Sequence, residues 1–451
     1  MNKYLLACAL LIHTHVSYGG VSADEAARLG RDLTPIGAER AGNVEGSIPE
    51  WTPLRPYGSP PGKYTLDPKM AEEKPLFTIT AANAAQYANR LTAGHRKLLQ
   101  TYPTYRMQVY PSRRDVSWPD AIVDATRVNA TRCGRDGDET LDNCRLGFPF
   151  PIPQAGAEPI WNHKLKWRGE ALTRYNNQLI VQSDGRYQLT KLVEDVDYPY
   201  ASIVNPVPLT RTSAEFSRYL SQTLAPPRLA GTFLLFVDRV AAGSQGRAGW
   251  TYSPSLRRVR RSSNLCCDNP YEGTDGHQFY DQIDMFNGTL SRFNWQLLGK
   301  RELYISYHAN RIANPKIKYA DMVRPGHFNP ELPRYELHRV WVVEGTVKPS
   351  VSHTFKRRVL YLDEDTWTIV AVDAYDHRDG LYQFQEGHLL VAARMLAGFT
   401  SPELIYHFSS GRYFVTGVAN EDKPPNTDPK FPADHFTPEA LRRRASVGAG
   451  E

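Results

Sequence analysis

The sequence lacks the features that mark several large classes of protein. Its main apolar run, from Leu5 to Ile12, is far shorter than the ~20 residues of a transmembrane helix, and no later stretch is long enough either. A phosphate-binding glycine loop, a Gly-x-Ser-x-Gly elbow, a His-Glu-x-x-His motif and a dinucleotide fingerprint are all missing. Internal repeats are missing too. These absences argue against membrane-spanning helices and against the enzyme classes that these motifs define.

The excess of basic over acidic residues is also small. The 54 Lys and Arg residues exceed the 48 Asp and Glu residues by a formal net charge of +6, spread along the chain, which does not call for a nucleic-acid partner. Hydrophobic residues make up 41% of the chain, enough for a sizeable core. The 33 prolines and 25 tyrosines favour a β-rich protein with many ordered, proline-containing connections.

The N-terminus has the layout of a secretory signal peptide. Lys3 precedes the short apolar run, and the small residues Gly19 and Gly20 follow it. We therefore expect residues 1–20 to be removed and the mature protein to be exported. The alternative is a lipoprotein, because Leu5–Cys8 resembles a lipid-attachment box, although it would leave only seven residues of signal before Cys8.

Cysteines are few, and four remain after the signal. The first choice for a disulfide is Cys133 with Cys144, which would close a short loop. Cys266 and Cys267 are adjacent, so a vicinal bridge or a cross-link to the first pair stays open. Neither pair has the spacing that lets two thiolates reach one zinc ion.

The periodicity predicts an α+β fold that is mostly antiparallel β. Helices are expected at 82–100 and 213–224, the second from an apolar stripe of Phe216, Tyr219 and Leu220. Short turns join the predicted strands, which implies antiparallel pairing. These strands cover 232–240, 248–252, 257–261, 335–347, 358–362, 367–372, 405–408 and 412–416. Residues 21–445 are expected to form one domain with an extended arm over 52–75. The tail from Lys423 is expected to be loosely ordered, and 446–451 to be flexible.

Candidate catalytic residues are scarce. His163 has no acidic or second histidine partner at usable spacing, so a structural role is favoured. His338 shares a strand face with Glu336, which predicts a simple pairing. Neither a metal site nor a cofactor is predicted.

Arginines are dense around Val259. Arg257, Arg258, Arg260 and Arg261 fit a solvated edge that blocks aggregation, or a docking patch for anionic lipid or an acidic partner.

A proline-rich segment, Gly147–Pro153, alternates apolar residues with prolines. Proline fixes the backbone in an extended form and removes hydrogen-bond donors, so the segment is confined to an edge. Its Phe148, Phe150 and Ile152 either face an interior or pack a rigid connector onto the core.

Several blocks of the sequence carry a family resemblance. They are residues 33–43, 148–153 with 160–163, 252–254 with 257–261, 284–288, 335–344 and 361–365. Over about residues 22–445 the chain resembles domain-of-unknown-function family 1329, exported proteins of Gram-negative bacteria often labelled outer-membrane lipoprotein-sorting proteins. The resemblance implies a fold like that of the carriers LolA and LolB, a half-barrel with helices as a lid over an apolar cavity. It also implies a periplasmic location, a companion outer-membrane protein of family 1302, and lipid-exporting inner-membrane pumps as partners. The four cysteines depart from the family pattern.

The resulting hypothesis is a periplasmic carrier or chaperone of hydrophobic cargo, such as a lipid, a lipoprotein or a sterol-like molecule. The helices at 82–100 and 213–224 are the lid candidates. A structural adaptor that docks through the arginine edge is the alternative, and an enzyme acting on exported lipid is a third hypothesis. The candidate ligand-binding residues are aromatic or aliphatic: Phe148, Phe150, Ile152, Trp161, Trp167, Trp250, Tyr335 and Trp341.

Overall fold

The structure, a computed structural model, describes residues 20–53, 68–210, 215–240, 246–262 and 265–447. The predicted signal peptide, apart from Gly20, lies outside the described residues, as does residue range 54–67 of the predicted arm. Within the described ranges, no helix has both the length and the apolar character that crossing a membrane requires.

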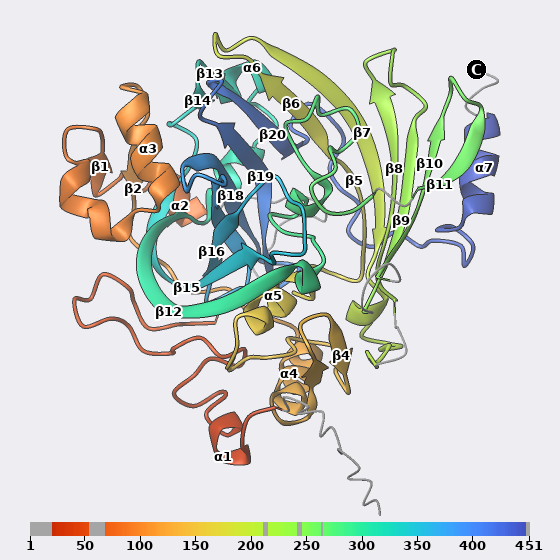
Figure 1. Ribbon diagram of the computed structural model, residues 1–451. Coiled ribbons are helices and arrows are strands. Elements are labelled where there is room, and N and C mark those ends of the chain that lie inside the picture. Colours follow the sequence, from red (N-terminus) through yellow and green to blue (C-terminus); the bar gives the residue numbers. More distant parts are fainter. Residues whose placement is uncertain (1–19, 54–67, 211–214, 241–245, 263–264, 448–451) are drawn as a thin grey trace, which may run out of the picture.

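A single 16-stranded sheet organises the molecule (Figure 1). Among the described strands, every pairing in this sheet is antiparallel except that of β2 with β15. The predicted fold class, a large curved and mostly antiparallel sheet with few helices, is therefore confirmed. The order is β1-β2-β15-β16-β17-β18-β19-β20-β6-β7-β8-β9-β10-β11, with β12 paired to β15 and β5 to β7.

The sheet has two halves that join where β20 pairs with β6, with Phe414 opposite Ile180. The first half consists of β5 (Ala171–Tyr175), β6 (Asn177–Val181), β7 (Tyr187–Asp197), β8 (Glu215–Ala225), β9 (Phe233–Arg239), β10 (Arg247–Ser253) and β11 (Arg258–Ser262). The second half consists of β12 (Phe293–Ser306), β15 (Tyr335–Val347), β16 (Arg357–Asp363), β17 (Ile369–Tyr375), β18 (Leu381–Ala392), β19 (Ala397–His407) and β20 (Arg412–Val418), extended by β1 (Phe77–Ile79) and β2 (Met107–Val109). The described strands do not close into a barrel.

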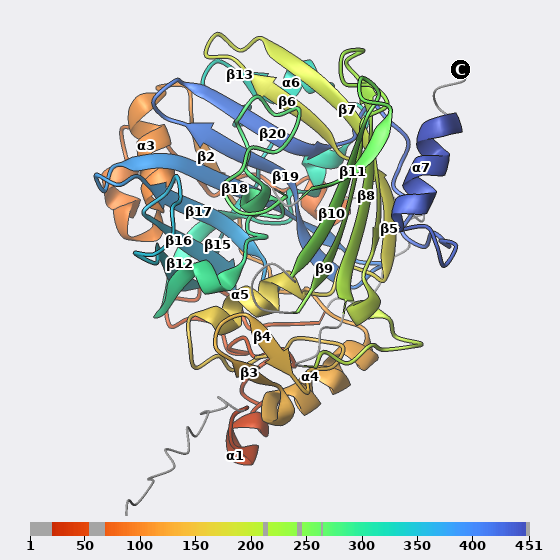
Figure 2. The ribbon, with the colours of Figure 1, turned by 45° about the vertical axis from the view of Figure 1, so that its right-hand side comes forward.

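The sheet is concave where β15–β20 and β7–β11 roll toward each other (Figure 2). The connection from β11 to β12, residues 265–292 with η4 (Tyr280–Gln282) and η5 (Leu290–Arg292), enters this concavity. The side chains of strand β18 alternate between the two faces of the sheet. Gln383 and Gln385 accept hydrogen bonds from Gln282 of that connection, whereas Phe384 and Glu386 contact His95 on the opposite face.

The predicted helix 82–100 is interrupted and is not a lid over the concavity. It divides into the 3-10 helix η1 (Ala84–Arg90) and α3 (Ala93–Thr101), because the Thr92 hydroxyl accepts from the His95 amide and starts a new helix. The amides of Ala93 and Gly94 donate to the Asp373 carboxylate on β17. Helix α3 thus packs on the face of the sheet that the 265–292 connection does not cover.

The predicted helix 213–224 is wrong, because Glu215–Ala225 is strand β8. Its apolar side chains have the spacing of a helical stripe, yet they serve different clusters on both faces of the sheet. Phe216 packs near Trp161, Tyr219 stacks on Phe236, and Leu220 packs below the C-terminal helix. A register shift between Glu215 and Ser217 also breaks the alternation. Residues 211–214, with the expected helix cap, lie outside the described residues.

The tail is ordered further than predicted. Helix α7 (Pro438–Val447) packs Leu441 and Ala445 onto Leu220, Leu235 and Tyr252 of the sheet. Its Arg444 pairs with Asp195 on β7 at 3.1 Å. The expectation of a loose tail therefore fails for this helix, while residues 448–451 lie outside the described part.

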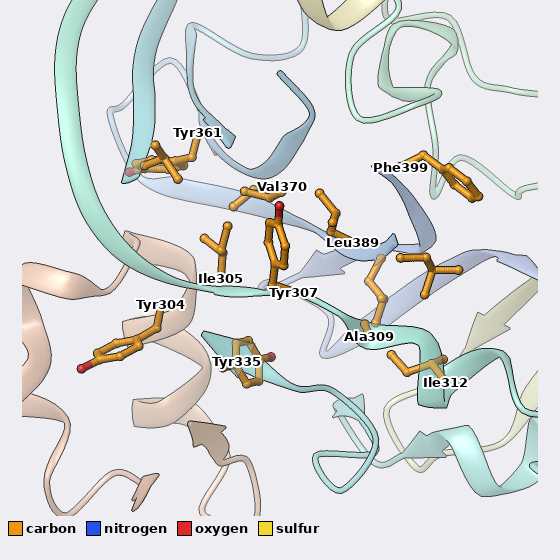
Figure 3. Packing of buried hydrophobic residues seen from close by; sticks show 14 of the residues in the cluster. Tyr304, Ile305, Tyr307, Ala309, Ile312, Tyr335, Tyr361, Val370, Leu389 and Phe399 are labelled. Atoms are coloured by element: carbon orange, nitrogen blue, oxygen red, sulfur yellow. The ribbon is translucent and has the colours of Figure 1, made fainter. Parts of the chain in front are cut away.

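The largest core cluster lies where β12 crosses over the sheet (Figure 3). Ile305 of β12 and Tyr307, which follows this strand, point toward Val370 of β17 and Leu389 of β18, and Tyr335 of β15 lies below them. The chain continues into η6 (Ala309–Ala313), α6 (Tyr319–Met322) and the short pair β13 (Val323–Arg324) and β14 (His327–Phe328).

The N-terminal part packs at one end of the sheet. It contains α1 (Ala23–Ala26), α4 (Asp120–Arg132), the hairpin β3 (Gly134–Asp136) and β4 (Thr140–Asp142), and α5 (Ala157–Lys164). The short helix α2 (Pro68–Ala71) lies apart from these elements (Figure 1), and the 3-10 turn η2 (Pro199–Ala201) follows β7. A disulfide joins Cys133 to Cys144 across the hairpin, and Cys266 and Cys267 are free thiols.

The proline-rich segment 147–153 is a connector whose apolar side chains enter three clusters. Phe148 and Phe150 are buried in separate cores, and Ile152 packs against a third. Two buried asparagine side chains form hydrogen bonds with its backbone in place of a neighbouring strand. Asn162 accepts from the Phe150 amide and donates to its carbonyl, at 2.8 and 2.7 Å, and Asn129 donates to the Phe148 carbonyl. A Cβ at Gly37, where φ is +99°, would clash with the Pro151 carbonyl.

Candidate ligand-binding cavities

A cavity of about 570 Å³ lies beside η6, and we call it the η6 cavity. Its size falls in the range of roughly 300–1,000 Å³ that small-molecule sites occupy. Buried apolar side chains form much of its wall, with Ile312 from η6, Leu390 from β18 and Val418 from β20 exposed by 2% or less. The lining also includes the apolar residues Met70, Ala71, Ala313, Pro315, Pro402, Ala419, Pro424 and Pro425.

Two asparagines hold η6 in place as a wall of this cavity. Asn310 donates to the Val391 carbonyl at 2.8 Å and accepts from the Val391 amide at 3.0 Å, which fixes the start of η6 to β18. Asn420 donates to the carbonyls of Ile312 and Asn314, which fixes the end of η6 to the chain after β20. Because both side chains are almost completely buried, these hydrogen bonds form away from water, and losing a partner there is costly.

Cations outnumber carboxylates around the η6 cavity. His308, Arg311, Arg334 and Lys423 line it, against Glu73 and Asp422. Burial lowers the pKa of His308, but the carboxylates of Glu336 and Asp115 outweigh burial and raise this pKa to about 9, so the imidazole is charged at neutral pH. Asp422 already pairs with Lys191 at 2.6 Å, and Glu73 with Arg334 at 2.7 Å.

Arg311 and Lys423 are the unneutralised cations of this lining. The Arg311 guanidinium donates to the backbone carbonyls of Glu331 and Leu332, and Lys423 is exposed. Neither forms an ion pair with any carboxylate in the described part of the chain. The cavity therefore combines an apolar interior with positive charge at its rim.

A second, smaller cavity of about 110 Å³ lies on the concave face, and we call it the Asp284 cavity. Strands β7, β8, β9, β19 and β20 contribute to it together with the 265–292 connection. Lys166 donates to the Asp284 carboxylate at 2.8 Å, and Arg168 pairs with the same oxygen. Burial alone would raise the pKa of Asp284, but Arg168 and Lys166 hold it well below its usual value.

His163 has a structural role beside this cavity. Its Nδ1 accepts from the Ile369 amide at 2.9 Å, so its Nε2 donates to the Asp284 carbonyl at 2.7 Å. Burial and the charge of Lys166 lower the pKa of His163 to about 3, so the ring is neutral.

Glu403 is the group in the Asp284 cavity best suited to exchange a proton near neutral pH. Burial and the nearby Asp284 carboxylate raise its pKa to about 7. The Thr400 hydroxyl and the Met285 amide donate to its two oxygens. The space beside it is too small for a ligand of ordinary size.

None of the eight predicted ligand-binding side chains lines either of these cavities. Phe148, Trp167 and Tyr335 lie in the largest core, Phe150 and Trp161 in a second core, and Ile152 in a small cluster with α1. Trp250 is half-buried below α7, and Trp341 stacks on Trp367 at 6.2 Å. Trp161 belongs to helix α5 and not to a strand.

The four predicted docking arginines are exposed at the edge strand β11 and the turn before it. Arg257 lies in the turn with φ at +48°, and the other three follow along the strand. Their guanidinium groups have no carboxylate partner within the described residues.

The residues that line the η6 cavity were missed because they come from several distant segments of the chain. Ile312, Leu390 and Val418 look like ordinary core residues in the sequence, and nothing in their spacing brings them together. Asn310 and Asn420 hold this wall in place, but their burial and their hydrogen bonds become visible only in the folded chain.

Comparison with known proteins identifies the family. Residues 78–442 match the family model described as "Protein of unknown function (DUF1329)". The uncharacterized protein PA3922 of Pseudomonas aeruginosa is 39% identical over 449 residues, which is 98% of each chain. A solved domain from Vibrio parahaemolyticus, described as outer membrane lipoprotein-sorting, is 14% identical and covers 64% of this chain and 98% of its own, with a TM-score of 0.43. The LolA superfamily protein NE2245 of Nitrosomonas europaea is 11% identical and covers 63% and 98%, with a TM-score of 0.37. The two sequence matches confirm the predicted resemblance, and the chain belongs to the DUF1329 family.

Proposed function

We propose that the protein is an exported, periplasmic carrier of a hydrophobic molecule with an anionic end, bound in the η6 cavity. The observation that carries this proposal is the cavity of about 570 Å³ walled by Ile312, Leu390 and Val418. Each CH₂ group moved from water into such a wall contributes about 0.8 kcal/mol, so a chain of several carbons binds without any specific polar contact.

The charge at the rim supports the anionic end. Arg311 and Lys423 lack carboxylate partners among the described residues, and a carboxylate or phosphate group there would be hydrogen-bonded as well as neutralised. In this proposal the cargo passes between lipid-exporting machinery of the inner membrane and a companion protein of the outer membrane.

The test is direct measurement of bound lipid. Mature protein purified without detergent is analysed by native mass spectrometry and solvent extraction, and its affinity for a fluorescent fatty acid is titrated. Ala313→Trp and Ala419→Trp, singly and together, place indole rings in the cavity. We expect a loss in affinity of about tenfold or more, equal to about 1.4 kcal/mol.

The matched control is Ala320→Trp, at an exposed position of α6 that does not line the cavity. It should bind the fatty acid like the wild type. A wild-type protein that carries no lipid and fails to bind the probe would refute the proposal, as would equal binding by the cavity variants.

A second candidate function is adaptor docking through β11. The four exposed arginines on the last strand of the sheet favour it, because an edge strand offers unpaired backbone groups beside their charge. Arg258→Glu with Arg260→Glu should abolish capture of an outer-membrane partner in a pull-down. Unchanged capture would exclude this edge as the docking site.

A further inference from the structure

Three buried side chains meet where the β16–β17 turn contacts β15. They are His338 of β15, Asp363 at the end of β16 and Asp365 in the turn that follows, and all three residues are fully buried. One donor atom from each lies within 4.8 Å of the others. His338 Nδ1 is 3.9 Å from Asp363 Oδ1 and 3.8 Å from Asp365 Oδ2, so the three atoms surround a common point.

Two of these atoms lack a hydrogen-bond partner among the described residues. His338 Nδ1 and Asp363 Oδ1 are buried without a hydrogen-bond partner anywhere in the described chain. Buried polar atoms in native proteins are nearly always paired, so both atoms indicate that something occupies the space between them. They do not belong to either cavity described above.

The surroundings orient the ligands. His338 Nε2 lies 3.2 Å from Glu336 Oε2 and donates to it, and Nδ1 on the other side of the ring faces the two carboxylates. A histidine that binds a metal usually donates its other ring N–H to a carboxylate in this way. The Thr366 hydroxyl donates to Asp363 Oδ2 at 2.7 Å and turns Oδ1 toward the imidazole.

Charge balance singles out Asp363. Arg114 binds both oxygens of Asp365 at 2.8 Å, and Lys300 and Arg339 pair with Glu364. Asp363, by contrast, has no Lys or Arg within ion-pair distance among the described residues, and His338 at 3.9 Å is its nearest cationic candidate. A buried carboxylate is stabilised by a cation close to it, and the space between Asp363 and His338 is where such a cation would bind.

The geometry points to a structural site for a divalent transition-metal ion, held by His338 Nδ1, Asp363 Oδ1 and Asp365 Oδ2. One imidazole and two carboxylates suit Zn²⁺ or Mn²⁺. Bond lengths near 2.1 Å place tetrahedral ligands about 3.4 Å apart, so the distances of 3.9 and 3.8 Å from His338 Nδ1 to the two carboxylate oxygens need to shorten by a few tenths of an ångström. The ion would fasten the β16–β17 turn to β15, and it would displace the proton that otherwise charges His338.

The experiment measures metal in the full mature chain. Protein is produced in minimal medium supplemented with Zn²⁺, Mn²⁺ or Co²⁺, and the metal per chain is determined by mass spectrometry. We expect close to one ion per chain for the wild type and the loss of most of it in Asp363→Asn. The control Asp379→Asn, an exposed carboxylate that pairs with Lys356, should keep the metal.

A second readout covers the case in which Asp363→Asn fails to fold. The Co²⁺ form of the wild type should show visible absorption without the near-ultraviolet thiolate band, which distinguishes this site from binding by Cys266 and Cys267. A wild type that holds no metal from any supplement overturns the inference. Equal metal in Asp363→Asn and Asp379→Asn, or a crystal structure with only a water between the three side chains, also overturns it.

Discussion

The η6 cavity and the Asp284 cavity share the strands β19 and β20, yet they have opposite chemistry. Pro402 and Val418 face the first, whereas Glu403 and Thr416 face the second, so neighbouring residues on the same strands serve the two sites. The first is large and apolar with charge at its rim, and the second is small with ion pairs at its centre. One sheet thus separates a space fit for a ligand from a polar cluster that fastens the 265–292 connection.

The largest expected effect comes from removing a charge in the ion pairs of the Asp284 cavity. Asp284→Asn leaves the fully buried Lys166 without its charge partner, and removal of one member of a buried pair costs about 3–5 kcal/mol. Because the Asp284 side chain is 25% exposed, we expect about 3 kcal/mol, the low end of that range, in urea unfolding. Asp376→Asn, in an exposed turn, should change the free energy of unfolding far less, and similar losses would contradict the assigned role.

Leu390→Ala tests the apolar wall of the η6 cavity. Truncating a buried leucine costs about 2–5 kcal/mol, and we expect about 2 kcal/mol because the side chain already borders a space that need not collapse. Fatty-acid binding should weaken in the same variant, while Leu256→Ala, at an exposed position, should alter neither property. A stability loss with unchanged binding would separate Leu390 from the ligand.

Stability should also fall as pH rises through the range in which Glu403 titrates. Its pKa is about 7 in the folded chain and near the ordinary value of 4.5 when unfolded. The folded state therefore holds the extra proton between these values, and the contribution present below pH ~4.5 is lost by pH ~7, at up to about 1.4 kcal/mol per pH unit. Glu403→Gln should flatten this slope in urea titrations at several pH values. A variant whose pH profile matches that of the wild type would show that another group is responsible.

The smallest effect is expected at the arginine edge, which belongs to neither cavity. Arg258→Glu with Arg260→Glu should change the free energy of unfolding by no more than about 0.5 kcal/mol, because exposed substitutions away from packed sites have little effect. Thermal unfolding is a sufficient check. A large loss would mean that the edge contributes to folding and would weaken its use as a docking test.

Strands β9, β10 and β11 of the first half and β15, β16, β17 and β20 of the second half lie close to their predicted ranges. The long strands β12 and β18 were not predicted, and the cavities could not be predicted. Tyr335–Val347 is a strand with the predicted bounds, because it is a long run rich in β-branched and aromatic residues. The pattern failed at β8, where Phe216, Tyr219 and Leu220 are buried on two faces and imitate a helix. A cavity depends on side chains such as Ile312 and Leu390 that meet only in the folded chain, and their pattern is that of any core residue. Aromatic residues attracted attention instead, yet Trp161 and Trp341 pack in the interior.

The pairing of β20 with β6 has a consequence for how the chain reaches its fold. Strand β6 pairs with β20, where Ile180 lies opposite Phe414, so this edge of β6 stays unpaired until nearly the whole polypeptide is available. An open edge recruits other strands, and long-range pairing of this kind is slow to form. The first half would therefore depend on a holding chaperone, or on delayed folding, until the last strand arrives. A chain shortened before Arg412 should aggregate even though each missing residue lies far from Ile180 in sequence.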